Sequence, residues 1–223
     1  RVVSGGFDLG LAFDGDADRV FVVDETGSGL SGSTTTALLA AATLRRHPGA
    51  TILHNLICSK AVPEVVIELG GTPVRTKVGH SFIKQVMAET GAEFGGEHSA
   101  HYYFARNFNA DSGLIASMMV MAEVGRSGVP LSEVRRPFER DAASGEINTQ
   151  VVDAHAVIER ISEEYADRPQ DRLDGLTVDC GSWWFNLRPS NTEPLLRLNL
   201  EADDRTTCDD GVSTLLSQIT SAG

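Results

Sequence analysis

The segment AFDGDADRVFVVDETG, residues 12–27, places three aspartates at alternate positions immediately before an apolar run. In an extended backbone alternate side chains point to the same face, so Asp14, Asp16 and Asp18 are predicted to converge. Converging carboxylates repel one another unless a cation lies between them, and hard divalent ions such as Mg²⁺ or Ca²⁺ prefer oxygen ligands. The segment therefore predicts a divalent cation site, with Arg19 directly beside it.

Two other structures could account for this segment. An Asp- and Gly-rich stretch is often only a solvated turn. A calcium-binding EF-hand loop requires glycine at its sixth position and a helix on each side. Here the sixth position is Arg19, and the VFVVD that follows is rich in β-branched residues, as a strand is. The sequence therefore excludes an EF-hand and favours a Mg²⁺ loop that leads into a strand.

The composition indicates a globular protein with an acidic surface. The 223 residues are 41% hydrophobic and 22% charged, with a formal net charge of −12. An acidic surface disfavours nucleic-acid binding but allows a few basic residues to hold a small phosphorylated ligand. The three cysteines have no paired spacing, which is typical of a reducing compartment. We find no signal peptide or membrane-spanning apolar run, and so expect a cytoplasmic, soluble protein without a nucleic-acid or membrane partner.

The first part of the chain alternates between short apolar runs and longer helical stretches. Such alternation predicts an α/β domain with a mainly parallel sheet. Ser33 or Thr34 is predicted to cap the first helix, and Ser81 the third. The expected strands lie at 19–24, 51–57, 72–77 and 92–97, and the expected helices at 35–47, 62–69, 81–90 and 111–128.

The pattern changes near residues 137–149, which are polar and contain Ser144–Gly145. We predict a linker there. A helix within 151–169, two strands at 175–190 and 194–202 with a loop between them, and a last helix at 207–223 then predict a small α+β domain.

Two further loops carry polar side chains suited to a phosphorylated sugar. In GGEHSAHYYF, residues 95–104, Glu97, Ser99 and His101 alternate, and a carboxylate beside a hydroxyl suits vicinal sugar hydroxyls. In RPSNTEP, residues 188–194, a guanidinium and several turn donors form a possible phosphate cradle, with Arg188, Ser190, Asn191 and Thr192 as its members. Each loop alone would equally fit a solvated turn, but together with a cation site they indicate a phosphosugar enzyme.

The segment VRTKVGHSFIK adds two residues just before an expected helix. His80 is a candidate for proton exchange near neutral pH, and Lys77 for proton transfer beside a suitable charge. A solvated lysine and a capping histidine explain the segment equally well. His47, His54 and His155 are predicted to be surface or half-buried residues without a role.

Four motifs, DGDADR, VGHSFIK, GGEHSAHYYF and RPSNTEPLLRLNLEA, occur in the order typical of one enzyme superfamily. In these motifs the chain resembles the α-D-phosphohexomutases, and Ala100 and Asn191 make it more similar to the phosphomannomutase branch than to phosphoglucosamine mutase. The resemblance spans essentially all 223 residues. It implies a four-domain enzyme in which residues 1–32 end domain 2, residues 33–140 form domain 3 and residues 146–223 form a mobile domain 4.

The resemblance also implies roles for the site residues. Asp14, Asp16 and Asp18 would bind Mg²⁺, with Arg19 near the transferred phosphoryl group, and Glu97 and Ser99 would hold the sugar 3- and 4-hydroxyls. Lys77, His80 and His101 would line the site, while Arg188, Ser190, Asn191 and Thr192 would clasp the other phosphate. Ala17 stands where the family often has glycine, a change that is tolerated if its φ is negative.

The family transfers phosphate from a phosphoserine in a TASHNP-like loop, through a hexose 1,6-bisphosphate, and no such loop occurs here. The resemblance therefore implies that the chain corresponds to the C-terminal half of such an enzyme, that the N-terminal half is a required partner, and that these residues alone are inactive. A noncatalytic phosphosugar-binding module and a phosphoglucosamine mutase are the alternatives, and an aspartate-nucleophile phosphatase is a weaker third.

Overall fold

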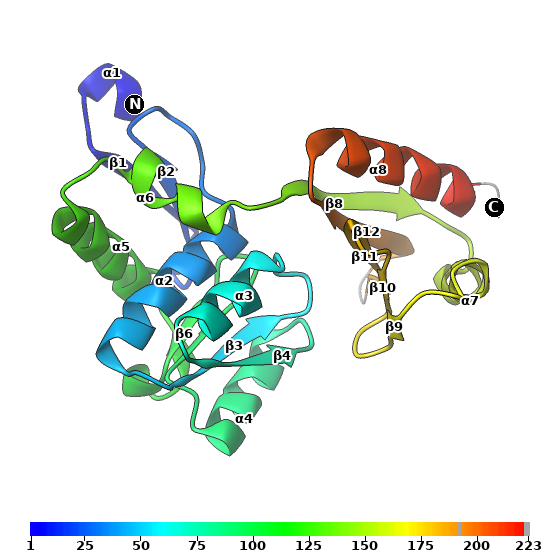
Figure 1. The fold of residues 1–223 in the computed structure, drawn as a ribbon, viewed down its shortest axis with the longest axis horizontal. Helices are drawn as coiled ribbons and strands as arrows, with labels where there is room; N and C mark the ends of the chain where they lie inside the picture. The colour runs from blue at the N-terminus through cyan, green and yellow to red at the C-terminus, as the bar shows by residue number, and fades with distance from the viewer. Residues whose placement is uncertain (191–192, 221–223) are drawn as a thin grey trace. The chain divides into compact units, whose positions relative to one another are not determined.

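The computed structural model describes residues 1–190 and 193–220 and divides into two compact units, residues 1–140 and 141–223 (Figure 1). Each unit has its own buried apolar core.

Unit 1 opens with a short helix and a β-hairpin that carries the aspartate loop. Helix α1 (Val2–Gly5) precedes β1 (Leu9–Phe13), which pairs antiparallel with β2 (Val20–Asp24). Val20 and Val22 are fully buried in the main core of the unit, because alternate residues of a strand share one face. The buried face of β2 thus fixes the position of the loop that precedes it.

The main sheet of unit 1 has five strands in the order β4-β3-β5-β6-β7. Strand β3 pairs in parallel with β4 and β5, whereas β5 and β6 and then β6 and β7 are antiparallel, so the prediction of a mainly parallel sheet is only half correct. Residues 97–101 are too short a connection for a parallel crossover. The strands are β3 (Thr51–Asn55), β4 (Thr72–Thr76), β5 (Phe94–Gly96), β6 (Tyr102–Phe104) and β7 (Ala110–Asp111).

Helices cover both faces of this sheet. Ile52 and Tyr102 face the core that contains α2, while their neighbours Leu53 and Tyr103 pack with Ile83 and Met87 of α4. This alternation makes a helix–sheet–helix sandwich. The longer helices are α2 (Gly32–Arg46), α3 (Ala61–Glu68), α4 (His80–Thr90) and α5 (Gly113–Ser127), and the shorter ones η1 (Ala105–Asn107), α6 (Leu131–Val134) and η2 (Arg136–Phe138) (Figure 1).

Two predicted helix caps are wrong. Ser31, not Ser33 or Thr34, caps α2, and its hydroxyl accepts a hydrogen bond from the backbone N–H of Thr34. Helix α4 begins after Gly79 without a side-chain cap, so Ser81 lies inside the helix. In both cases several polar residues precede the apolar face, and the backbone turn before the helix determines which of them caps it.

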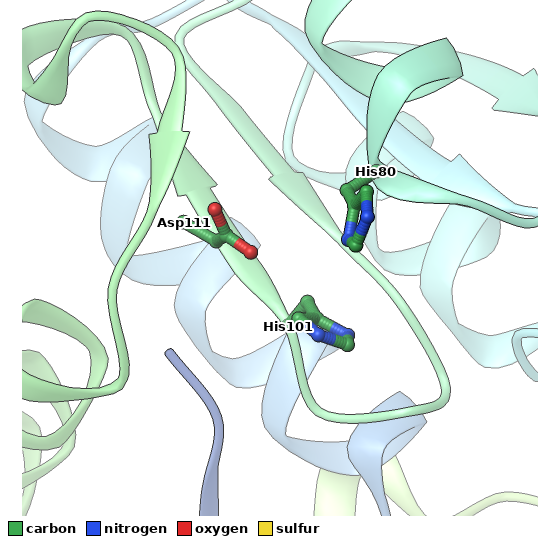
Figure 2. A group of neighbouring side chains, drawn as sticks. All are labelled: His80, His101 and Asp111. Carbon is green, nitrogen blue, oxygen red and sulfur yellow. The ribbon is translucent and has the colours of Figure 1, made fainter. Parts of the chain in front are cut away.

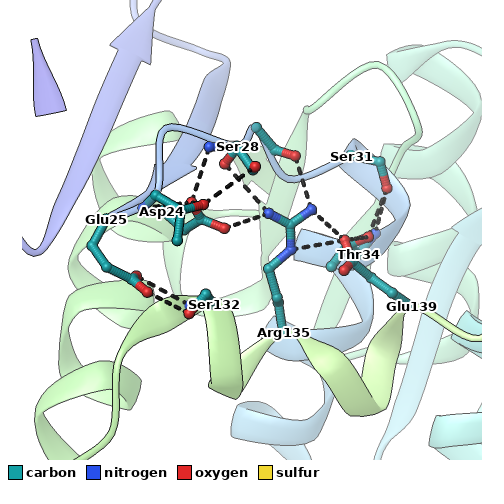
Figure 3. A network of polar contacts seen from close by, with 10 residues as sticks. Asp24, Glu25, Ser28, Ser31, Thr34, Ser132, Arg135 and Glu139 are labelled. Atoms are coloured by element: carbon teal, nitrogen blue, oxygen red, sulfur yellow. Dashed lines mark hydrogen bonds and ion pairs between the residues drawn. The ribbon is translucent and has the colours of Figure 1, made fainter. Parts of the chain in front are cut away.

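A buried polar network attaches the turn after β2 to the α6–η2 segment (Figure 3). Asp24 is 2% exposed, and its carboxylate accepts hydrogen bonds from the Thr26 hydroxyl, the Ser28 backbone and the Arg135 guanidinium, at 2.6, 2.9 and 2.7 Å. Burial acts in the opposite direction, but these donors lower the pKa of Asp24 below its usual value. Arg135 also pairs with Glu139, whose side chain is partly exposed to solvent.

Unit 2 is an antiparallel sheet in the order β8-β12-β11-β10-β9 with two helices on one face. Leu196, Leu198 and Leu200 pack against α7 and α8, while the alternate residues form the polar face. The predicted strand at 175–190 is two strands, because residues 180–182 interrupt it. The elements are β8 (Ala142–Gln150), α7 (Ala154–Glu164), β9 (Gln170–Asp171), β10 (Leu176–Asp179), β11 (Trp183–Pro189), β12 (Leu195–Ala202) and α8 (Arg205–Thr220).

The linker predicted at 137–149 contains the boundary between the two units, at residues 140 and 141, but most of it is not a linker, because residues 142–150 form β8. Glu146 pairs with Asn199 and Ala143 with Glu201, so β8 has one extra residue there, and Gly145 has a φ of 70°. These are the features of a β-bulge. The Ser144 hydroxyl accepts a hydrogen bond from the backbone N–H of Leu200. A Ser-Gly pair in the sequence is compatible with a bulge as well as with a linker.

Among the helices of the described residues, none by itself is long and apolar enough to cross a membrane. Helix α5 and residues 131–138 satisfy length and composition criteria only as a pair, which is bent by 94°.

His54 gives unit 1 a specific pH dependence. It is 5% exposed in β3, contrary to the prediction of a surface or half-buried residue. Burial lowers the pKa of His54 from 6.5 to about 4. The charge of Arg75 acts in the same direction, and the hydrogen bond with the Asn55 carbonyl acts against it. Between these values the unfolded chain binds the proton and the folded chain does not, so stability falls as pH falls. We expect acidification from pH 7.5 to 4.5 to cost about 2–3 kcal/mol through His54 alone.

The measurement is urea unfolding of the wild type and His54→Gln at both pH values. The variant should lose less stability on acidification than the wild type, while the exposed His155→Gln should behave like the wild type. Equal pH dependence in the wild type and His54→Gln would refute the prediction.

Candidate active site

Asp14, Asp16 and Asp18 converge, as predicted, but not through an extended backbone. One oxygen from each carboxylate lies within 4.8 Å of the other two, in the loop between β1 and β2. In a flat strand, side chains two residues apart would be separated by roughly 7 Å. The loop instead curls at Ala17, whose φ is +61°, in the left-handed region, so the condition under which alanine would replace glycine without strain is not met.

Backbone contacts hold this loop from two sides. The N–H of Gly113, the first residue of α5, donates to the Ala17 carbonyl at 3.2 Å, and Arg19 forms a β-bridge with His101. A side chain at Gly113 would place its Cβ 2.7 Å from the Arg19 carbonyl oxygen, so the approach requires glycine. The aspartate loop is thereby joined to residues 97–101.

The charges in the loop are only partly balanced. The Arg19 Nε lies 2.7 Å from Asp14 and 3.7 Å from Asp18. Desolvation opposes ionisation of Asp14, but its pairing with Arg19 outweighs this and lowers the pKa of Asp14. The pKa of Asp18 is raised by burial and by repulsion from the neighbouring carboxylates, although His101 acts in the opposite direction. Asp18 Oδ1 is buried without a hydrogen-bond donor among the described residues. A buried, underbalanced carboxylate oxygen beside two others fits a divalent cation.

Glu97, which is predicted to bind a sugar hydroxyl, is almost completely buried. It is 2% exposed, and its carboxylate accepts hydrogen bonds from the Tyr103 hydroxyl at 2.6 Å, the Asn55 amide at 3.1 Å and the Gly79 backbone at 3.3 Å. Burial and the Glu97 charge raise the pKa of Tyr103, so its hydroxyl remains a donor. Nothing in the sequence marks Asn55 or Tyr103 as supports of this loop, because their role depends on strand pairing.

His101 lies between the two loops. Its Nδ1 is 2.9 Å from the Ser99 hydroxyl, and its Nε2 is 3.7 Å from Asp18 Oδ2. Ala100, between Ser99 and His101, has a φ of +69° and is buried. The turn at Ala100 therefore directs Ser99 and His101 to the side of the cation loop.

Of the two residues predicted near the start of α4, one joins this group. The His80 ring lies 5.8 Å from that of His101 (Figure 2). The exposed Lys77 instead lies over the Phe82 ring. The lysine in the group is Lys84, whose Nζ is 3.1 Å from Asp111. Its spacing of four residues from His80 on one helix face is the signal that would have identified it.

In unit 2 the predicted phosphate cradle contains a second arginine. Arg188 and Arg197 face each other across β11 and β12, and both bind Glu146, at 2.8 and 3.1 Å. Arg197 also lies 3.4 Å from the Ser190 hydroxyl. The Nε atoms of both arginines are buried without an acceptor among the described residues. The predicted ligands Asn191 and Thr192 lie outside the described residues.

Two family models match the chain. The one described as "Phosphoglucomutase/phosphomannomutase, alpha/beta/alpha domain III" covers residues 31–140, and the one described as "Phosphoglucomutase/phosphomannomutase, C-terminal domain" covers residues 146–212. The chain belongs to the phosphoglucomutase/phosphomannomutase family. The sequence resemblance and the predicted fold class are thus confirmed.

Curated members of the family are substantially similar in sequence. A phosphomannomutase of Methanocaldococcus jannaschii is 44% identical over 212 residues, which are 95% of this chain and 47% of that protein. A phosphomannomutase of Escherichia coli K12 is 42% identical over 204 residues, 90% of this chain and 45% of that protein. The chain spans about half the length of the curated relatives it matches.

Solved structures of the family share the fold. A phosphoglucomutase/phosphomannomutase family protein of Burkholderia thailandensis superposes with a TM-score of 0.86 at 27% identity, over 98% of this chain and 48% of that one. An Aspergillus fumigatus N-acetylphosphoglucosamine mutase, solved with GlcNAc-6P and magnesium, superposes over 96% of this chain and 48% of that one with a TM-score of 0.70. At 15% identity the latter shows the fold alone.

The left-handed alanine in the aspartate loop leads to a stability prediction. Ala17→Gly removes the cost of about 1–2 kcal/mol that alanine bears in the left-handed conformation. Glycine also gives the unfolded chain more conformational freedom, which lowers the free energy of unfolding by about 0.4–1 kcal/mol. We expect the variant to be more stable by about 0.5–1 kcal/mol in urea unfolding without divalent cations.

Ala12→Gly is the matched control, because Ala12 lies in β1 and is not among the residues with positive φ. This variant should be destabilised by about 0.5–1 kcal/mol. An equal loss of stability at both positions would contradict the geometry at Ala17.

Proposed function

We propose that the full-length protein is a cytoplasmic phosphomannomutase that interconverts mannose 6-phosphate and mannose 1-phosphate, with glucose phosphates as further substrates. The observation that carries the proposal is the β-bridge between Arg19 and His101, which joins the three-carboxylate loop to the Glu97–Ser99–His101 segment. The identity of 42–44% to two curated phosphomannomutases supports the choice of substrate.

Mg²⁺ is the proposed cofactor, held by Asp14, Asp16 and Asp18. The buried, underbalanced Asp18 oxygen supports an all-oxygen cation site. When bound, Mg²⁺ supplies positive charge that stabilises the oxygens of a transferring phosphoryl group. Arg19 adds a second positive charge beside the same carboxylates, and we assign it to the transferring phosphoryl group.

The residues of the second loop are proposed to bind and orient the sugar. Ser99 offers a hydroxyl at the edge of the group, and His101 exchanges a proton with a sugar hydroxyl through Nε2 while Ser99 holds Nδ1. Glu97 makes its longest hydrogen bond, 3.3 Å, with the Gly79 N–H. We propose that a sugar hydroxyl replaces this donor, with His80 and Lys77 lining the approach.

Arg188, Ser190, Asn191 and Thr192 are proposed to bind the phosphate that is not transferred, and Arg197 joins them. Two guanidiniums that share one carboxylate favour a further anion, because one negative charge balances only one of them. The transferred phosphate would come from a phosphoserine in the half of the protein absent from this chain. The hexose 1,6-bisphosphate formed would turn over between the two half-reactions.

The test of the function uses the complete gene product and mannose 1-phosphate. Asp16→Asn should lower kcat/KM by about 100-fold or more, because an exposed cation ligand is lost without loss of packing. Asp8→Asn, an exposed aspartate at the other end of the same hairpin, should leave it unchanged. Preferential turnover of glucosamine phosphates would instead identify a phosphoglucosamine mutase. Binding without turnover would identify a noncatalytic module.

The phosphate cradle has a separate test in the same enzyme. Arg188→Lys and Arg197→Lys should each raise KM by about 10–100-fold in both directions, because lysine keeps the charge and loses the planar fork. Arg172→Lys, in the exposed ion pair with Glu159, is the control. An effect of Arg188→Lys alone would remove Arg197 from the proposed site.

A further inference from the structure

A second group of metal-ligating side chains lies beside the aspartate loop. His80 comes from the first turn of α4, His101 from the turn before β6, and Asp111 from the end of β7 (Figure 2). One ligand atom from each lies within 4.8 Å of the other two. Three separate segments of the chain therefore contribute to one cluster.

This donor set differs from that of the aspartate loop. Two imidazole nitrogens and one carboxylate oxygen suit Zn²⁺ and similar borderline ions, whereas Mg²⁺ prefers oxygen ligands alone. We propose that His80, His101 and Asp111 form a binding site for Zn²⁺, separate from the three-carboxylate loop.

The ligands are close to the required geometry. Zinc–ligand bonds of about 2.0–2.1 Å place tetrahedral ligand atoms roughly 3.4 Å apart, so no pair has to close by more than about 1.4 Å. His80 is exposed, and movement of its side chain would accommodate this change. His101 is held by Ser99 through Nδ1, which leaves Nε2 as the metal ligand. A hydrogen-bonded second nitrogen is the usual arrangement of a metal-binding histidine.

Two neighbours influence the affinity in opposite directions. Lys84 lies 3.1 Å from Asp111 and opposes a second cation, while Asp18 lies 3.7 Å from His101 Nε2 and favours one. Removal of the Lys84 charge should therefore tighten Zn²⁺ binding, whereas removal of a ligand weakens it. Opposite signs from neighbouring substitutions would distinguish a metal site from a general effect on folding.

Occupancy would inhibit turnover, because a ligated His101 Nε2 cannot exchange a proton with a substrate. This consequence rests on the function proposed above, but the metal site itself does not. Zn²⁺ binding is therefore measured directly, on the 223-residue chain without a polyhistidine tag.

The experiment is a calorimetric titration with Zn²⁺ in excess Mg²⁺, which occupies the aspartate loop. We expect one Zn²⁺ per chain. His80→Ala and Asp111→Asn should each weaken Zn²⁺ binding by at least about 10-fold. Removal of a group that only hydrogen-bonds to a ligand already lowers metal affinity by about 10-fold or more, and removal of the ligand itself should cost at least as much. Lys84→Met should tighten it about fivefold. His155→Ala, an exposed histidine of unit 2, should have no effect.

Two outcomes would overturn the proposal. Zn²⁺ binding that excess Mg²⁺ abolishes would place the ion in the aspartate loop. Binding that His80→Ala leaves unchanged would place it at another site, such as a thiol. Circular dichroism of each variant verifies that the fold is retained.

Discussion

The electrostatic repulsion among Asp14, Asp16 and Asp18 is the constraint on which unit 1 depends, since their ligand oxygens lie within 4.8 Å of one another. A free loop would open and relieve this repulsion. Opening is opposed by the paired strands on either side, by the Gly113 N–H bound to the Ala17 carbonyl, and by the bridge between Arg19 and His101. These are backbone contacts, which do not depend on the charges of the side chains.

The second loop is held by a different means. Glu97 is buried among donors from Tyr103, Asn55 and the Gly79 backbone, and a buried carboxylate is stable only with such partners. Both loops nevertheless turn at an alanine in the left-handed region, Ala17 and Ala100. Conformations of this kind persist only where the surrounding contacts determine them, which is common at functional sites.

Unit 2 contains the same kind of charge imbalance with the opposite sign. Arg188 and Arg197 lie opposite each other on neighbouring strands and share the carboxylate of Glu146. Like charges directly opposite in a sheet are unfavourable unless a counter-charge lies between them. The proposed Mg²⁺ and phosphate sites thus rest on opposite charge imbalances, a cluster of carboxylates in one unit and a pair of guanidiniums in the other.

The sequence by itself determined the family and the two classes of structure, and its contiguous motifs supplied most of the candidate site residues: Asp14, Asp16, Asp18, Glu97, Ser99, His101 and Arg188. Tertiary structure decided which of these meet and what supports them. Arg197 opposes Arg188 only through strand register, and Asp111 meets His80 and His101 only through the packing of β7, β6 and α4. Ser144–Gly145 is a bulge and not a linker, because strand β12 lies beside it. The spacing of residues within one motif indicates what kind of ligand they could bind, whereas contacts between distant segments arise only from strand pairing and helix packing.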